Sequence, residues 1–226
     1  MKIGLVIATI DEFKTLFDNL DYKYEFIDNG NFKVYKYKIN NHDVYVINSG
    51  IGEISAAIST QFLIDNFDIE LVINYGVVGG LNKNLELRKC VIVKDVIHYD
   101  FDVSKIDKVP VGYYEAFKTQ YLNLNYDLLK SYSLDINLPL VRCASGDKFI
   151  SNSKIKEELF KKYNADICDM ELAGICLTCL LNNVKIISIK AISDTTYGGA
   201  EDYLKFAKNA SEEAFNIVRL LLNKLN

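Results

Sequence analysis

The chain has 226 residues, half of them hydrophobic and a quarter charged, which is typical of a folded globular protein and excludes a disordered tail or linker. Its net charge is −4, and the basic residues are scattered rather than gathered into a stripe that could neutralise phosphates. Nucleic acid is therefore not expected as a partner. The length suits one α/β domain, and we expect residues 1–226 to form a single domain.

Apolar spacing predicts strands and helices in alternation, the pattern of an α/β protein in which helices cover both faces of a central mixed, largely parallel sheet (a three-layer αβα fold). In chain order we expect a strand at 2–8, a helix at 12–20, strands at 32–39 and 44–48, a helix at 54–67, strands at 71–74, 90–97 and 140–145, helices at 153–163 and 172–181, a strand at 185–191 and a helix at 202–225.

Two of these regions have a predicted place in the fold. The strands at 32–39 and 44–48 are joined by a turn at Asn40 and Asn41, so they should form an antiparallel pair toward one edge of the sheet. Residues 98–126 lack a regular spacing and are rich in Tyr, Asp and Lys. We expect them to form a long surface connection that serves function or an interface.

The N-terminus lacks the basic region, long apolar core and small-residue cleavage site of a signal peptide, and no apolar run reaches membrane-spanning length. Five cysteines lie mostly inside apolar stretches, as buried thiols in a reducing compartment do. They are Cys90, Cys143, Cys168, Cys176 and Cys179. Cys176 and Cys179 have CxxC spacing, but no second pair or nearby histidine completes a zinc site, and His42 and His98 are isolated. We expect a cytoplasmic protein without membrane contact, metal or cofactor, with both histidines at the surface or a strand edge.

Acidic residues follow three of the apolar runs. Glu12 comes just after the first strand, Glu171 belongs to the cluster Asp169-Met170-Glu171, and Asp194 ends the run that begins at Ser188. The carboxyl ends of strands are where open α/β sheets gather ligand-binding groups. Taken singly, these acids could instead be groups that favour a helix start.

Two glycine-rich loops follow expected strands. The first, Gly50-Ile51-Gly52, resembles half of a dinucleotide fingerprint, but Ser55 stands where the third glycine would be. Neither this loop nor the second, at 75–80, has the Lys-Ser/Thr ending of a phosphate-binding P-loop. NAD binding and ATP hydrolysis are therefore not expected. The glycines permit close backbone approach to a ligand, with ordinary tight turns as an equal alternative.

Six short motifs follow one another over nearly the whole chain. They are Met1–Gly4 leading to Asp11-Glu12, Ser49–Gly52, Asn74-Tyr75-Gly76 with Gly79-Gly80, Ser145–Ile150, Asp169-Met170-Glu171 and Ala191–Asp194. In this order and spacing the chain resembles the methylthioadenosine/S-adenosylhomocysteine nucleosidases of the purine nucleoside phosphorylase superfamily. A seventh segment, 99–103, is similar to one beside the dimer interface of that family. The resemblance implies a nucleoside phosphorylase-like fold without cofactor or metal.

The resemblance implies a hydrolase that cleaves the N-glycosidic bond of an adenine nucleoside, such as methylthioadenosine or S-adenosylhomocysteine, and releases adenine and the ribose product. Asp194 would protonate or hydrogen-bond N7 of adenine, which requires a carboxyl group kept protonated by partial burial. Glu12 would position and deprotonate the attacking water. Glu171, with Met170, would hold the ribose hydroxyls as positive charge develops on the ring.

Further positions carry over from the same family. Phe149 would stack on the purine, and the backbone of Ile150 would read its Watson–Crick edge, although each alone could be a core residue. The remaining positions of the expected substrate site are Ile51, Gly76, Val77, Lys190 and Ser193.

The chain departs from the family near the expected water and ribose. Val77 stands where the nucleosidases carry serine, and Lys190 where they carry arginine, which removes a hydroxyl and a planar hydrogen-bonding fork. Thr9 is polar where the pocket for the 5′ substituent is apolar in relatives. Tyr197 and Tyr203 are candidates for the wall of that pocket. The 5′ substituent is therefore open, and an adenosine-preferring nucleosidase is an alternative.

Two further alternatives belong to other functional classes. A phosphate-dependent purine nucleoside phosphorylase would need a glycine near the first strand and an arginine before the second glycine loop, where this chain has Glu12 and Asn74. A carboxylate at that place would repel phosphate, so the residues favour hydrolysis. An inactive nucleoside-binding protein is suggested by Val77 and Lys190, but the three retained acids argue against it.

Family members pair through the region that matches roughly residues 98–117, and a neighbouring subunit contributes to the 5′ pocket. We therefore expect a homodimer. Large aromatic side chains are favoured at interfaces over lysines. The segment carries Tyr99, Phe101, Tyr113, Tyr114 and Phe117.

Overall fold

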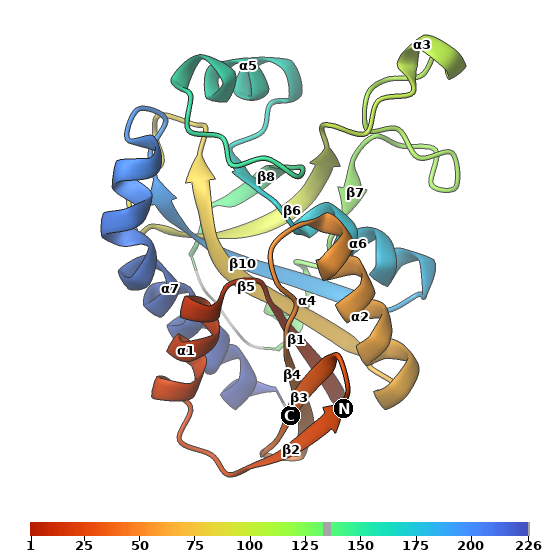
Figure 1. Cartoon of the computed structure of the whole chain (residues 1–226), viewed down its shortest axis with the longest axis vertical. Helices are drawn as coiled ribbons and strands as arrows, with labels where there is room; N and C mark the ends of the chain where they lie inside the picture. The colour runs from red at the N-terminus through yellow and green to blue at the C-terminus, as the bar shows by residue number, and fades with distance from the viewer. Residues whose placement is uncertain (133–136, 226) are drawn as a thin grey trace.

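A computed structural model of the chain describes residues 1–132 and 137–225 (Figure 1). Its strands are β1 (Lys2–Ile7), β2 (Tyr24–Asn29), β3 (Phe32–Ile39), β4 (His42–Asn48), β5 (Leu71–Gly80), β6 (Cys90–His98), β7 (Leu122–Asn123), β8 (Leu140–Ser145), β9 (Ile167–Asp169) and β10 (Lys185–Asp194). Its helices are α1 (Ile10–Asn19), α2 (Glu53–Phe67), α3 (Ser104–Asp107), α4 (Leu128–Ser131), α5 (Ser153–Tyr163), α6 (Leu172–Leu181) and α7 (Gly199–Lys224). Every strand and helix expected from the sequence is present.

The described strands form one mixed sheet in the order β10-β6-β8-β9-β5-β1-β4-β3-β2. The neighbours β4, β1, β5 and β10 run parallel to one another. Strands β2, β3 and β4 are antiparallel, and they place the expected antiparallel pair beside the β2 edge. Strand β10 also pairs antiparallel with β6, so the strands from β10 through β6, β8 and β9 to β5 close into a ring.

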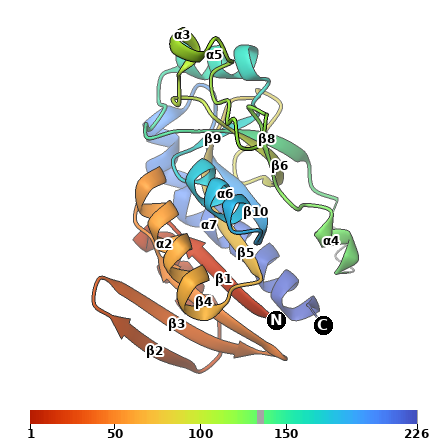
Figure 2. The same cartoon turned by 90° about the vertical axis from the view of Figure 1, so that its right-hand side faces the viewer.

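Helices cover both faces of the parallel strands. Helix α7 packs on β10 and β5 and contacts α1, whereas α2 packs against α6 and β1 on the opposite face. The two pairs of helices lie on opposite sides of the sheet in Figure 1, and Figure 2 shows the same arrangement from the side. The predicted three-layer αβα fold with a central mixed sheet is confirmed.

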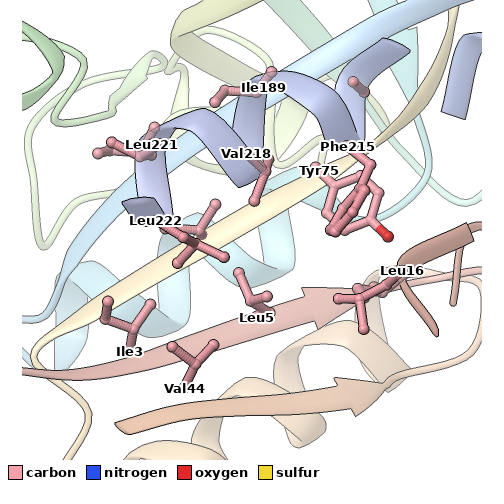
Figure 3. Packing of buried hydrophobic residues seen from close by; sticks show 14 of the residues in the cluster. Ile3, Leu5, Leu16, Val44, Tyr75, Ile189, Phe215, Val218, Leu221 and Leu222 are labelled. Carbon is pink, nitrogen blue, oxygen red and sulfur yellow. The ribbon is translucent and has the colours of Figure 1, made fainter. Parts of the chain in front are cut away.

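The contact between α7 and the sheet is apolar. Phe215, Val218 and Leu222 of α7 lie over Leu5 of β1 and Tyr75 of β5, and all five are at most 1% exposed (Figure 3). Burying one such side chain fully contributes about 1.5 to 3 kcal/mol. This packing fixes β1 and β5 against each other, which matters because both strands carry site residues at their carboxyl ends.

The isolated polar and sulfur residues are largely buried. The five cysteines are free and buried. His42 was expected at the surface or a strand edge, but it is 3% exposed and its Nε2 lies 3.0 Å from the carbonyl oxygen of Leu225, so α7 covers it. Within residues 1–132 and 137–225, no His, Cys, Asp or Glu cluster could hold a metal ion. No helix in the same ranges is both long and apolar enough to cross a bilayer.

Candidate active site

A cavity of about 330 Å³ opens at the carboxyl ends of β1, β5 and β10. All three predicted acids line it: Glu12 from α1, Glu171 from the β9–α6 junction and Asp194 from the end of β10. Seven further positions predicted for the substrate site also line this cavity. They are Ile51, Val77, Phe149, Ile150, Met170, Lys190 and Ser193.

The first turn of α1 holds the carboxylate of Glu12 in place. Thr9 caps the helix, since its hydroxyl accepts from the backbone N–H of Glu12 while Glu12 Oε2 accepts from the backbone N–H of Thr9 at 2.9 Å. Glu12 Oε1 accepts from the backbone N–H of Val77 at 2.7 Å. Both carboxylate oxygens thus accept hydrogen bonds from backbone N–H groups, and only 4% of the residue is exposed. The side chain is therefore fixed in position. A fixed carboxylate can orient a water molecule and take its proton.

Gly76 does not line the cavity, but it makes room for Glu12. A Cβ at position 76 would lie 2.4 Å from Glu12 Oε1, closer than two such atoms can approach. Glycine at position 76 therefore allows the side chain of Glu12 to pack against β5. Gly76, predicted to bind substrate, thus lies beside the cavity and provides space for Glu12.

Glu171 is held at the loop between β4 and α2. Its Oε1 accepts from the backbone N–H of Gly52 at 3.1 Å, where Gly52 has a φ of +106°, a conformation that suits glycine. Burial foremost, and then the nearby Asp169, raise the pKa of Glu171 to about 7. A carboxyl group that ionises near neutrality can accept hydrogen bonds from ribose hydroxyls in its charged form.

Lys190 is the cation among these acids. Its Nζ lies 3.0 Å from Asp169 Oδ2, and both side chains are almost fully buried. Burial alone would lower the pKa of Lys190, but Asp169, Glu171 and Glu12 outweigh that effect and raise it. The lysine thus stays charged and offsets part of the negative charge of the cavity.

Behind Asp169 lies a buried chain of hydrogen bonds that sequence reasoning missed. The hydroxyl of Ser145 lies 2.5 Å from Asp169 Oδ1, contacts Glu53 Oε1 and accepts from the backbone N–H of Ala173. A serine hydroxyl has one hydrogen, so it can donate to only one of the two carboxyl groups. The other must supply its own proton, and Glu53 is the one that fits, because burial foremost, and then Asp169, raise its pKa to about 8.

The carboxyl group of Asp194 is 2% exposed and contacts the ammonium group of Lys156, which comes from α5. Its Oδ1 lies 2.9 Å from the hydroxyl of Ser193. The predicted role of Asp194 requires a carboxyl group kept protonated by partial burial, and the structure adds a buried cation in contact with that group. Lys156 was missed because a lysine in the run Ser153–Tyr163 looks like an ordinary exposed helix residue.

Aromatic and apolar groups form the remaining wall. Phe149 is 47% exposed, and its ring meets that of Tyr203 edge-on with centroids 5.4 Å apart. Tyr203 and Thr9, which the sequence predicted for the 5′ side, line the cavity. Tyr197 does not line it: the residue is 66% exposed, and its hydroxyl lies 3.2 Å from Glu157. The half-exposed ring of Phe149 leaves one apolar face available to a planar ligand.

Comparison with known proteins places this chain in a family. The sequence pattern of the phosphorylase superfamily matches residues 2–223. The chain is 30% identical to the aminodeoxyfutalosine nucleosidase of Campylobacter jejuni, with all of both chains covered. It is 31% identical to the 5′-methylthioadenosine/S-adenosylhomocysteine nucleosidase of Staphylococcus haemolyticus, with 99% of this chain and all of the relative covered.

Solved structures share the fold. The 5′-methylthioadenosine/S-adenosylhomocysteine nucleosidase of Helicobacter pylori superposes with a TM-score of 0.92 at 22% identity, covering 100% of this chain and 99% of the other. The S-adenosylhomocysteine nucleosidase of Streptococcus pyogenes gives a TM-score of 0.91 at 20% identity, covering 100% and 98%. At these identities the structures establish the fold.

Proposed function

The chain belongs to the phosphorylase superfamily, among the methylthioadenosine/S-adenosylhomocysteine nucleosidases, and we propose that it hydrolyses the N-glycosidic bond of an adenine nucleoside. The observation that carries the proposal is the convergence of Glu12, Glu171 and Asp194 on one cavity beside a half-exposed aromatic ring. No cofactor is needed for this reaction, because the three acids can supply its proton transfers and charge stabilisation.

Each acid has a distinct part in the proposed reaction. Water bonds to the anomeric carbon and loses a proton to Glu12, while the carbon–nitrogen bond breaks and its electron pair passes to the purine. Asp194 gives a proton to N7, so that the base leaves as neutral adenine. Glu171 accepts hydrogen bonds from the ribose, and these strengthen as the ring becomes cationic.

Water is favoured over phosphate as the nucleophile. Glu12 places a carboxylate beyond the end of β1, and its two oxygens already accept hydrogen bonds from backbone N–H groups. A phosphate ion bound here would lie close to the carboxylates of Glu12 and Asp169. Lys190 is the neighbouring cation, and it is paired with Asp169. Repulsion between like charges in a buried site is large, so phosphate binds poorly there.

The proposal is tested by chromatography of free base released from methylthioadenosine, S-adenosylhomocysteine, adenosine and inosine, with and without phosphate. We expect adenine release that does not depend on phosphate and that is lost in Asp194→Asn. Release that requires phosphate would make the chain a phosphorylase. Binding of a nucleoside without release from any of the four would make it an inactive binding protein.

The chemical class of the 5′ substituent on the substrate is inferred from the cavity lining together with the names of relatives. Thr9 adds a hydroxyl and Tyr203 an aromatic ring to the side where the substituent would lie. Methylthioadenosine and S-adenosylhomocysteine are the substrates in the names of several relatives, and aminodeoxyfutalosine is that of another. We propose an adenine nucleoside with a modified 5′ group, and the ranking of the four substrates above tests it against plain adenosine.

We also propose a homodimer. Ile51, Ile54 and Ile58 are 59%, 71% and 52% exposed and follow one another at helical spacing from the start of α2. An exposed apolar row beside a substrate cavity is suited to cover by a second subunit. Light scattering is expected to give twice the chain mass of 25.7 kDa, and a mass of one chain at micromolar concentration would contradict the proposal. Five buried free thiols also support the proposed cytoplasmic location.

A further inference from the structure

Lys156 reaches Asp194 from the side away from the cavity. Its Nζ contacts Asp194 Oδ2 and donates to the carbonyl oxygen of Thr195 at 2.8 Å, and its side chain is 0% exposed. Asp194 lines the cavity, whereas Lys156 does not. The lysine is therefore not placed to touch a ligand in the cavity, and its contact with the cavity wall is through Asp194.

A buried ammonium group requires a counter-charge. Transferring an unpaired charge from water into a protein interior is very unfavourable, and an opposite charge in contact favours the ionised form of both partners. Asp194 is the carboxyl group in contact with Lys156. An ion pair between them leaves Asp194 without a proton, although the proposed reaction asks Asp194 to donate one.

The titratable groups that line the cavity with Asp194 include the acids Glu12, Asp169 and Glu171 and the cation Lys190. Cys168 on β9 has a pKa of about 12, raised chiefly by burial, and burial also raises the pKa of Tyr203 on α7. Lys156 is the cation in direct contact with the carboxyl group of Asp194.

The neighbouring hydroxyl can serve both protonation states of Asp194. Ser193 Oγ lies 2.9 Å from Asp194 Oδ1 and 3.1 Å from the carbonyl oxygen of Val78. Its one hydrogen can point to the ionised Asp194, or it can turn to Val78 and let a protonated Asp194 donate to Ser193. The site can thus accept a proton on Asp194 without rearrangement of the backbone.

We propose that Lys156 is a positioning residue that keeps Asp194 ionised in the empty site, so that the proton destined for N7 enters together with the nucleoside. This inference rests on the proposed function. One proton from solvent binds to Asp194 as the nucleoside enters, and it passes to N7 when the glycosidic bond breaks. Asp194 returns to its ionised form against Lys156, and Glu12 later releases to solvent the proton that it took from water.

The charge of Asp194 can be measured without a substrate. Aspartate labelled with ¹³C at the side-chain carboxyl gives an NMR signal whose position depends on protonation, and the signal missing in Asp194→Asn identifies Asp194. We expect the carboxylate position in the wild-type chain throughout pH 6 to 8.5. In Lys156→Met, and in the second neutral variant Lys156→Gln, we expect the protonated position at pH 7. Lys156→Arg keeps the charge and should restore the carboxylate position.

Kinetics supply the second readout, with methylthioadenosine as the probe. A lone buried Asp194 holds its proton to higher pH, so the alkaline fall of kcat/KM should move upward by at least one pH unit in Lys156→Met. Its plateau kcat should fall about tenfold, because a more tightly held proton is transferred more slowly. Lys161→Met is the matched control, since its side chain on the same helix is 74% exposed, and its profile should equal that of the wild type.

Three outcomes would overturn the proposal: a protonated Asp194 in the wild-type chain at pH 7, an Asp194 signal that does not move in either neutral variant, or an unshifted alkaline limb. Absence of base release from methylthioadenosine would count against the proposed function instead, and the NMR titration would still decide the role of Lys156.

Discussion

Replacing Glu12 by glutamine is expected to lower kcat for base release by roughly 10³-fold, within the range that a general base contributes. The variant keeps the size of the side chain but loses the group that takes the proton from water. It also loses one acceptor, because Thr9 N–H and Val77 N–H each donate to a separate oxygen of Glu12. The amide NH₂ must face one of these donors, which we expect to cost roughly 1 to 3 kcal/mol of stability.

Initial rates with saturating nucleoside, together with thermal unfolding at pH 7, check both parts of this prediction. Asp11→Asn is the matched control, because Asp11 lies in the same helical turn but its side chain is 84% exposed and does not line the cavity. Its rate should stay within about twofold of the wild type, as an exposed acid away from the reacting atoms allows. A Glu12→Gln rate within tenfold of the wild type would remove Glu12 from the proposed mechanism.

Replacing Glu53 by glutamine is expected to stabilise the empty protein at alkaline pH and to change little at pH 5. The pKa of Glu53 is about 8 in the folded chain against an ordinary value of 4.5, so folding favours its protonated form. The stability gained in this way is fully present below pH 4.5 and is lost as the pH rises through 8. Glutamine resembles the protonated acid: its NH₂ can donate to Ser145, and its oxygen can accept from the backbone N–H of Gly174.

The size of the effect follows from the shift. At about 1.4 kcal/mol per pKa unit, the difference between Glu53→Gln and wild type should reach roughly 3 to 5 kcal/mol at pH 9. For a chain of this length that corresponds to a rise in Tm of roughly 6 to 20 °C. Calorimetry from pH 5 to 9 without nucleoside measures it, with the exposed Glu158→Gln as control. Parallel stability curves for Glu53→Gln and wild type would show that Glu53 is already ionised at neutral pH.

The sequence predicted the layers of the fold well because apolar residues recur at regular spacing along the long helices and strands. Short or exposed elements left no such signal. Strand β2 is missed because most of its side chains are exposed, and β9 because it has three residues. Strands β5 and β10 extend past their expected ends, because glycines in the added part of β5 and Ser193 and Asp194 in that of β10 interrupt the apolar pattern.

For the site, the sequence located the residues that line the cavity but not those behind them. Glu12 and Asp194 stand at strand ends, where a local pattern can be read. Lys156 and Glu53 sit in the opening turns of helices, where charged residues are usually solvated, and their burial depends on contacts with distant segments. Lys156 meets a residue 38 positions away and Glu53 one 92 positions away. Such pairings depend on the tertiary fold, so helix periodicity does not predict them.

The ring of strands has a consequence for how the protein behaves at high concentration. A sheet that ends in free strands can add strands from other molecules, and ring closure removes that opportunity for β10, which is bonded on both sides. Among the described strands, β2 and the two-residue β7 each pair with one neighbour, β3 and β6, so β2 is the longer strand with a free edge. Tyr24 and Phe26 expose about half of their surfaces there, but Glu25 and Asp28 alternate with them along the strand. Charge repulsion between copies of this edge therefore opposes aggregation at the place where the sheet is most open to it.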